Sequence, residues 1–242
     1  MRYVLLMIVM AVVFFTSCNK TNSSNANVLL YNATWSVNSI SAAWNGTSIV
    51  TAAIAQGMSS GTRAVAYLQV PAGTNLVTLK AGSDTLVDKN IYTLSSAGTS
   101  FLFFDTSAVI AARPRILQLT DILTQPDTGQ ISYRFIHASP DTGTRVDVWL
   151  VNGITDSVRL DTAGLFIGKE AAASAVQSFT AISYNVKAYT VKIKKTGTQI
   201  LYASVANYPF VKRGIYSIIF SGLPAGTGNA GFKLSVLQHQ SP

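Results

Sequence analysis

The sequence contains few of the residues that usually carry chemistry at a protein site. It has one Cys, two His and a single Glu, Glu170. One Cys excludes a disulfide framework, and one Cys with two His excludes a zinc site built from several such ligands. Charged residues make up only 12% of the 242 residues, about half of the usual quarter, which argues against a coiled coil or long exposed helices.

What is present favours strands and turns. Hydrophobic residues account for 48% of the chain, which excludes a disordered protein. Its polarity comes mainly from Ser, Thr, Asn and Gly, residues that are common in turns. The length allows one large or two modest domains at roughly 100–150 residues each.

The N-terminus has the pattern of a secretory signal. A positive charge at Arg2 precedes the apolar run Val4–Phe15, which is followed by Thr16-Ser17-Cys18. The run is shorter than the roughly 20 residues that a membrane-spanning helix needs, so we expect a cleaved signal peptide. A Cys directly after small residues resembles a bacterial lipobox, in which the Cys carries the lipid anchor. An ordinary signal peptide is the alternative.

This pattern predicts the layout of the chain. We expect a lipoprotein signal peptide over 1–17, a polar tether over 18–26 and folded sequence over 27–242. Asn19 follows the Cys, whereas an Asp there would resemble an inner-membrane retention signal. The expected location is therefore the outer membrane, with the periplasmic and cell-surface faces both open.

Short matches recur in the same order along the two halves. The pairs are Asn32-Ala33 with His137-Ala138, Asn45-Gly46 with Asn152-Gly153, Lys80-Ala81-Gly82-Ser83 with Lys195-Thr196-Gly197-Thr198, and Gly98 with Gly214. Short apolar or alternating stretches separated by Gly and Pro turns are typical of β-sandwiches. We expect an all-β fold of two tandem immunoglobulin-like or transthyretin-like β-sandwich domains, 27–125 and 126–242. The one stretch with helical character is Lys169–Val176.

The opening of the second half resembles a known family. The segment is Arg134-Phe135-Ile136-His137-Ala138-Ser139-Pro140-Asp141, then Val146-Asp147-Val148-Trp149 and the turn Asn152-Gly153. It is similar to the domain of unknown function 4397 family of secreted and lipid-anchored bacterial proteins, with Trp149 where Tyr is usual. The resemblance covers roughly Gln130–Gln238, and the first half looks like a diverged copy. It implies a β-sandwich and an envelope location, and no established reaction.

The family motif also contains the best catalytic candidates. His137 lies near Ser139, Asp141 and Asp147, which permits a His–Asp pair or a Ser nucleophile with a base. The structural interpretation is favoured, because Ser-Pro-Asp is turn chemistry and His137 would pin that turn. A weak calcium site at Asp141 and Asp147 is the other alternative, although calcium prefers several carboxylates in one loop. We therefore expect no catalytic residue, no metal and no cofactor.

The net charge of +8 raises the question of an anionic partner. Lys187, Lys192, Lys194 and Lys195 form a candidate basic binding face. Such a face attracts phosphate backbones, anionic lipid or acidic polysaccharide by charge, and a solvated strand face is the alternative. In an envelope lipoprotein we expect polysaccharide or another envelope protein rather than nucleic acid.

These observations predict a lipid-anchored envelope protein that binds, adheres or acts as a scaffold without catalysis. A pilin-like fimbrial subunit is the structural alternative. Bacteroidetes pilins are also lipoproteins of two β domains, and Arg63 and Arg113 would be the sites of their activating cleavage. A hydrolase that uses His137 is the weaker alternative.

Overall fold

The computed structural model describes residues 24–60, 67–106, 114–140, 145–152, 156–164, 178–184, 188–224, 226 and 228–240. Several sequence predictions lie outside this part of the chain: the signal peptide 1–17, Cys18, Arg63, Arg113, Asp141, Gly153, Lys169–Val176 and Lys187. The described residues form strands almost throughout, and the all-β prediction is confirmed. Their one helical element is the 3₁₀ turn η1 (Gly228–Ala230), and no helix there is long and apolar enough to cross a membrane.

The strands of the first half form two sheets. One has the order β5-β1-β8-β9, and the other has the order β3-β2-β6-β7, with β4 paired to β2. The strands are β1 (Asn25–Asn32), β2 (Ser39–Trp44), β3 (Thr47–Ser48), β4 (Ile54–Ala55), β5 (Leu68–Pro71), β6 (Gly73–Ala81), β7 (Asp84–Thr93), β8 (Gly98–Phe104) and β9 (Arg115–Asp121).

The second half repeats this arrangement, with sheets β13-β10-β16-β17 and β12-β11-β14-β15. Its strands are β10 (Gln130–His137), β11 (Val146–Asn152), β12 (Asp156–Gly164), β13 (Thr180–Ser183), β14 (Tyr189–Lys195), β15 (Leu201–Tyr208), β16 (Ile215–Ser221) and β17 (Lys233–Gln240). In each half the first strand pairs in parallel with a late strand, β1 with β8 and β10 with β16, and the other described pairs are antiparallel.

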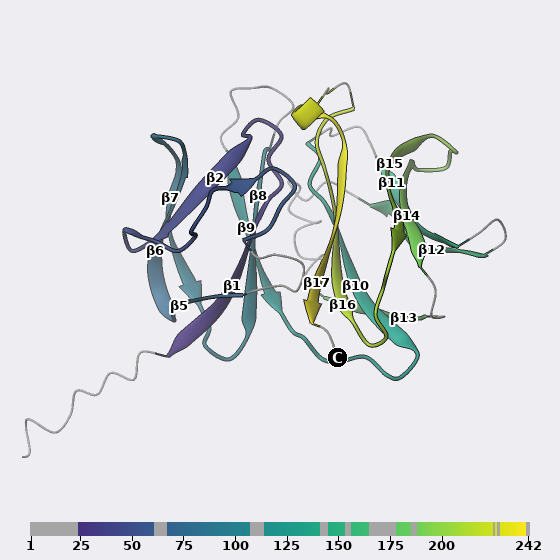
Figure 1. Cartoon of the computed structure of the whole chain (residues 1–242), viewed down its shortest axis with the longest axis horizontal. Helices are drawn as coiled ribbons and strands as arrows, with labels where there is room; N and C mark the ends of the chain where they lie inside the picture. The colour runs from purple at the N-terminus through teal and green to yellow at the C-terminus, as the bar shows by residue number, and fades with distance from the viewer. Residues whose placement is uncertain are drawn as a thin grey trace, which may run out of the picture.

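The four sheets are stacked as layers across the molecule (Figure 1). The sheets that contain β1 and β10 lie side by side in the middle, and the sheets that contain β6 and β14 lie at opposite ends. Each half has its own hydrophobic core between its two sheets. A third cluster of buried side chains, which includes Tyr31, Leu102, Ile136 and Ile219, draws on strands of both middle sheets. The halves are therefore packed into one body.

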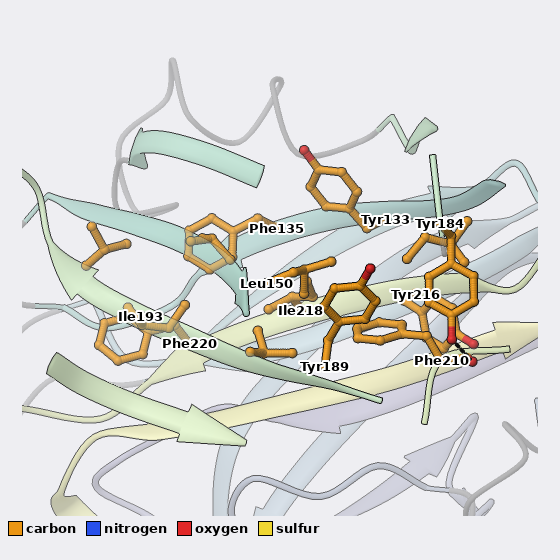
Figure 2. Close-up of a cluster of buried hydrophobic side chains, with 14 residues drawn as sticks. Tyr133, Phe135, Leu150, Tyr184, Tyr189, Ile193, Phe210, Tyr216, Ile218 and Phe220 are labelled. Carbon is orange, nitrogen blue, oxygen red and sulfur yellow. Dashed lines mark hydrogen bonds between the residues drawn. The ribbon is translucent and has the colours of Figure 1, made fainter. Parts of the chain in front are cut away.

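The core of the second half is rich in aromatic rings (Figure 2). Phe210 packs against Tyr216 with ring centroids 4.8 Å apart, in the edge-to-face geometry that aromatic pairs prefer. The Tyr184 hydroxyl donates to the carbonyl of Phe210 at 2.6 Å, so its polar end is satisfied inside the core. These contacts fix the β13 end of the sandwich.

Position in the stack explains the apolar runs of the middle strands. Phe135 faces the core of its own sandwich, and Ile136 faces the cluster between the halves. Both sides of β10 are therefore covered, and all but its first residue are buried. A strand buried on both faces loses the alternation that marks a half-exposed strand. By contrast, β14 alternates between buried and half-buried positions, as expected for an outer layer.

Candidate functional site

The family motif begins where β10 ends. His137 is 1% exposed, and its Nδ1 accepts the backbone N–H of Ser139 at 3.3 Å. Its ring packs edge-on against Phe220 with centroids 5.3 Å apart. The Ser139 hydroxyl in turn donates to the carbonyl of Gly222 at 2.6 Å. These contacts hold the turn after β10 against the end of β16.

The remaining described motif residues also contact the scaffold. Ala138 and Val146 are fully buried, and Pro140 is buried as well. The Asp147 carboxylate accepts the Thr196 hydroxyl at 3.1 Å and the Gly197 N–H at 3.3 Å. Asp147 therefore ties β11 to the turn between β14 and β15.

A second tie lies at the far end of β11. The Asn152 side chain donates to the Ala188 carbonyl at 2.8 Å, which links the end of β11 to the residue before β14. Within the described residues, no three His, Cys, Asp or Glu side chains gather closely enough to hold a metal ion.

The first half places Asn32 where the second half has His137. Asn32 ends β1, and its Oδ1 accepts the Thr34 N–H at 3.1 Å and the Thr34 hydroxyl at 2.6 Å. The residues that follow make the same backbone bond, from Ala33 N–H to Phe103 and from Ala138 N–H to Phe220. Asn32 and His137 thus make the same hydrogen bond at corresponding strand ends, because each side chain accepts the backbone N–H two residues further on.

This correspondence gives a testable expectation for His137. We expect His137→Ala to lower the free energy of unfolding by about 2 kcal/mol, from one buried hydrogen bond and lost ring packing. His137→Asn copies the first half, keeps the acceptor and should lose about half as much. Urea unfolding of the three proteins measures the difference. Equal losses for both variants would show that the acceptor contributes nothing.

A buried polar cluster that the sequence interpretation did not identify joins the two halves. Arg134 on β10 forms an ion pair with Asp121 at the end of β9, with Nη2 and Oδ1 2.7 Å apart and both side chains at most 1% exposed. The Arg134 Nε donates to the Ser217 hydroxyl at 2.7 Å. The guanidinium also lies over the ring of Phe179, 4.6 Å from its centroid.

The cluster closes through the second histidine. Tyr67 donates to Asp121 Oδ2 at 2.8 Å and lies 2.9 Å from His239 Nδ1. His239 Nε2 lies 2.6 Å from the Ser217 Oγ. Since Tyr67 donates to the carboxylate, the network assigns the proton of a neutral His239 to Nδ1, which leaves Nε2 to accept from Ser217.

Burial sets the protonation states in this cluster. It lowers the pKa of His239 to about 4, with Asp121 opposing and Arg134 adding to the shift. It also raises the pKa of Tyr67, and the nearby Asp121 carboxylate adds to that shift. Gly98 leaves room for the Tyr67 ring, because a Cβ there would lie 3.0 Å from it.

The Ser217–His239–Asp121 arrangement contains the residue types of a hydrolytic triad. Ser217, however, is 1% exposed and lies on β16, an inner strand of one of the two middle sheets. A nucleophilic hydroxyl must reach the carbonyl of a substrate, and the buried Ser217 hydroxyl is not accessible to a substrate. The cluster is a clasp between the halves, defined here as Tyr67, Ser100, Asp121, Arg134, Ser217 and His239.

One comparison with known proteins identifies the family. The sequence model described as Domain of unknown function (DUF4397) matches residues 26–149, just over half of the chain. The chain belongs to the DUF4397 family. The match contains the His-Ala-Ser-Pro-Asp and Val-Asp-Val-Trp segments that carry the resemblance and spans the first half. It ends at Trp149, so it covers only the opening of the predicted extent Gln130–Gln238. No curated protein matches the chain.

Three residues of the predicted basic face, Lys192, Lys194 and Lys195, lie on β14 of the outer β12-β11-β14-β15 sheet of this DUF4397 protein. Lys192 and Lys194 alternate with buried Val191 and Ile193 on β14, so both face away from the core. Lys195 follows at the exposed end of that strand. Two residues outside the predicted set join this face, Trp149 on β11 and Arg159 on β12. The sequence carries no local signal for this placement, because only the strand pairing brings Trp149 between Arg159 and Lys192.

The DUF4397 protein also has a groove between its halves. It has a volume of about 690 Å³ and lies between residues 50–60 and strands β15 and β17. The Ser235 hydroxyl donates to the Gly57 carbonyl at 3.0 Å, and Lys233 donates to the Gln56 amide oxygen at 3.0 Å. These bonds fasten the 50–60 segment of the first half to the edge strand of the second.

Proposed function

We propose that this DUF4397 protein is a non-catalytic binding or scaffold component of the bacterial cell envelope. The observation that carries the proposal is the clasp between the halves. Ser217, His239 and Asp121 are bound to one another or to Arg134 inside the four-layer body, and the two outer sheets are left to face partners. His137 and Ser139 are likewise buried and bonded to the scaffold.

We also propose that the two halves are tandem copies of one module. The orders β5-β1-β8-β9 and β13-β10-β16-β17 correspond strand by strand, each with one parallel pair in the same place. The Gly turns Lys80–Ser83 and Lys195–Thr198 connect corresponding hairpins. The ordered sequence matches predict that one module was duplicated. The equal strand order and the corresponding turns of the two halves support this proposal.

Attachment to the outer membrane is proposed from the lipobox-like sequence at Cys18. Several acyl chains on one residue anchor a protein stably, whereas a single chain binds reversibly. We expect Cys18→Ser to abolish incorporation of labelled palmitate in the native host and to move the protein from the membrane fraction to the soluble fraction. Asn19→Ala, one residue further, is the matched control and should behave like the unchanged chain. Membrane retention of Cys18→Ser would contradict lipid anchoring.

The binding role is tested with the purified Cys18→Ser chain mixed with isolated envelope material. We expect the chain to sediment with polysaccharide or protein of that material and to release no soluble product from it over time. Product release that His137→Ala abolishes, in a protein that stays folded, would replace this proposal with a hydrolase. Fibre formation after Arg-specific proteolysis would replace it with a fimbrial subunit. Protease treatment of intact cells then assigns the protein to the surface or to the periplasm.

A further inference from the structure

The outer face of the β12-β11-β14-β15 sheet carries an indole ring among cations. Val148 and Leu150 point into the core, so Trp149 between them points outward. In register, Trp149 lies between Arg159 of β12 and Lys192 of β14. The Arg159 guanidinium is 5.7 Å from the Trp149 ring, and the Lys194 ammonium is 5.5 Å from it. We call Trp149, Arg159, Lys192 and Lys194 the Trp149 face.

The indole holds the long basic side chains in place. Cation–π contacts at exposed sites contribute about 0.5–1 kcal/mol each, and Lys194 also donates to the Gln199 amide oxygen at 2.6 Å. Ordered cations lose less entropy when an anion binds than free lysines do. Asp147, on the same side of β11 and opposite Lys194 in register, is 5% exposed and accepts hydrogen bonds from the β14–β15 turn.

The corresponding face of the first half shows that the fold does not need these residues. There Ala43 pairs with Ser48 on one side and with Thr78 on the other, as Trp149 pairs with Arg159 and Lys192. Thr78 donates to Asp88 at 2.6 Å, so this face carries an acid. The corresponding sheet of the first half thus forms with Ala43, Ser48 and Thr78 at the positions that pair as Trp149, Arg159 and Lys192 do. The aromatic ring and the cations of the second half therefore have a cause other than folding.

We propose that the Trp149 face binds an anionic polysaccharide, and this inference rests on the proposed binding function. Arg159 and Lys192 are two strands apart, roughly 10 Å, a separation on the scale of the repeat of a linear sugar chain. Guanidinium groups bind carboxylate or sulfate through paired hydrogen bonds.

The contacts of Trp149 favour this ligand over the other common polyanions. Single-stranded nucleic acid binds by stacking bases on open aromatic rings, and two cations already lie over this ring. Anionic membranes recruit clusters of four to eight basic residues. The Trp149 face instead presents a short row across three neighbouring strands.

The test measures binding of the Cys18→Ser chain to polygalacturonate, dextran sulfate and uncharged dextran by calorimetry at several salt concentrations. The triple variant Arg159→Ala, Lys192→Ala, Lys194→Ala should bind the charged polymers at least tenfold more weakly, with a reduced salt dependence. The control Lys80→Ala, Lys89→Ala removes two exposed cations from the first half and should stay within twofold. Thermal unfolding verifies that each variant is folded. Equal binding by the triple variant, or equal binding of uncharged dextran, would overturn the proposal.

A second variant separates an organised site from simple charge attraction. Trp149→Leu keeps every cation, and we expect it to weaken binding about threefold to tenfold. Unchanged binding would mean that charge attraction alone accounts for the affinity, and it would overturn the inference. Tighter binding of single-stranded DNA or of phosphatidylglycerol vesicles than of the charged polysaccharides would also overturn it. If the triple variant still sediments with envelope material, the Trp149 face is not the binding site, and the proposed binding function stands. If the Cys18→Ser chain without further substitutions does not sediment at all, the proposed binding function itself is contradicted.

Discussion

Replacing Arg134 with methionine is expected to lower the free energy of unfolding by about 3–5 kcal/mol, the range for removing one partner of a buried ion pair. The variant leaves the Asp121 carboxylate, whose side chain is 0% exposed, with hydrogen bonds from the Tyr67 and Ser100 hydroxyls and no counter-charge from Arg134. A buried charge without a counter-charge is the costly state. For a chain of this size the midpoint of thermal unfolding should fall by roughly 10 °C.

The double variant Asp121→Leu, Arg134→Met shows whether charge is the cause. Because it removes both ions together, we expect it to be more stable than the single variant Arg134→Met. Arg115→Met, at the exposed start of β9, is the surface control and should change stability by less than about 0.5 kcal/mol. Urea unfolding followed by tryptophan fluorescence measures all four proteins. A loss below about 1 kcal/mol for Arg134→Met would mean that the ion pair does not hold the halves together.

The sequence predicts some of the strands and not how they pair. The strands with clear apolar content, such as those at Val28–Tyr31 and Ile215–Phe220, lie within β1 and β16. Strand β7 gives no such signal, because an edge strand exposes most of its residues and shows no alternation. The parallel pairing of β1 with β8 joins segments far apart in the chain, and no local pattern specifies it.

The sequence also indicates which polar residues are buried, but not which of them are partners. Arg134 was visible as a charge between Tyr133 and Phe135 in an otherwise apolar strand, which signals a buried, paired Arg. Its partner Asp121 lies before the connection to the second half, and His239 lies near the end of the chain. Only the packing of the two middle sheets brings these residues together. Composition and periodicity predict what is buried, and they do not predict which buried polar groups meet.

The stability of the clasp is expected to depend on pH through His239. Its pKa is lowered from 6.5 to about 4 in the folded protein, so between these values the unfolded chain binds a proton that the folded chain does not. The stabilisation is therefore complete above pH 6.5 and is lost as the pH falls toward 4. A shift of this size corresponds to about 3 kcal/mol.

His239→Gln isolates this contribution, because it removes the titrating ring and leaves Asp121, Arg134 and Tyr67 in place. We expect the unchanged protein to lose about 3 kcal/mol more than His239→Gln between pH 7 and pH 4. Urea unfolding at half-unit pH steps gives both curves, and pH effects that the two proteins share cancel in their difference. Parallel curves would show that His239 takes up its proton at the same pH whether the chain is folded or not. Protonation of the ring in the folded state must then be compensated by Asp121, which lies 3.9 Å from Nδ1, and the clasp would tolerate a charged histidine.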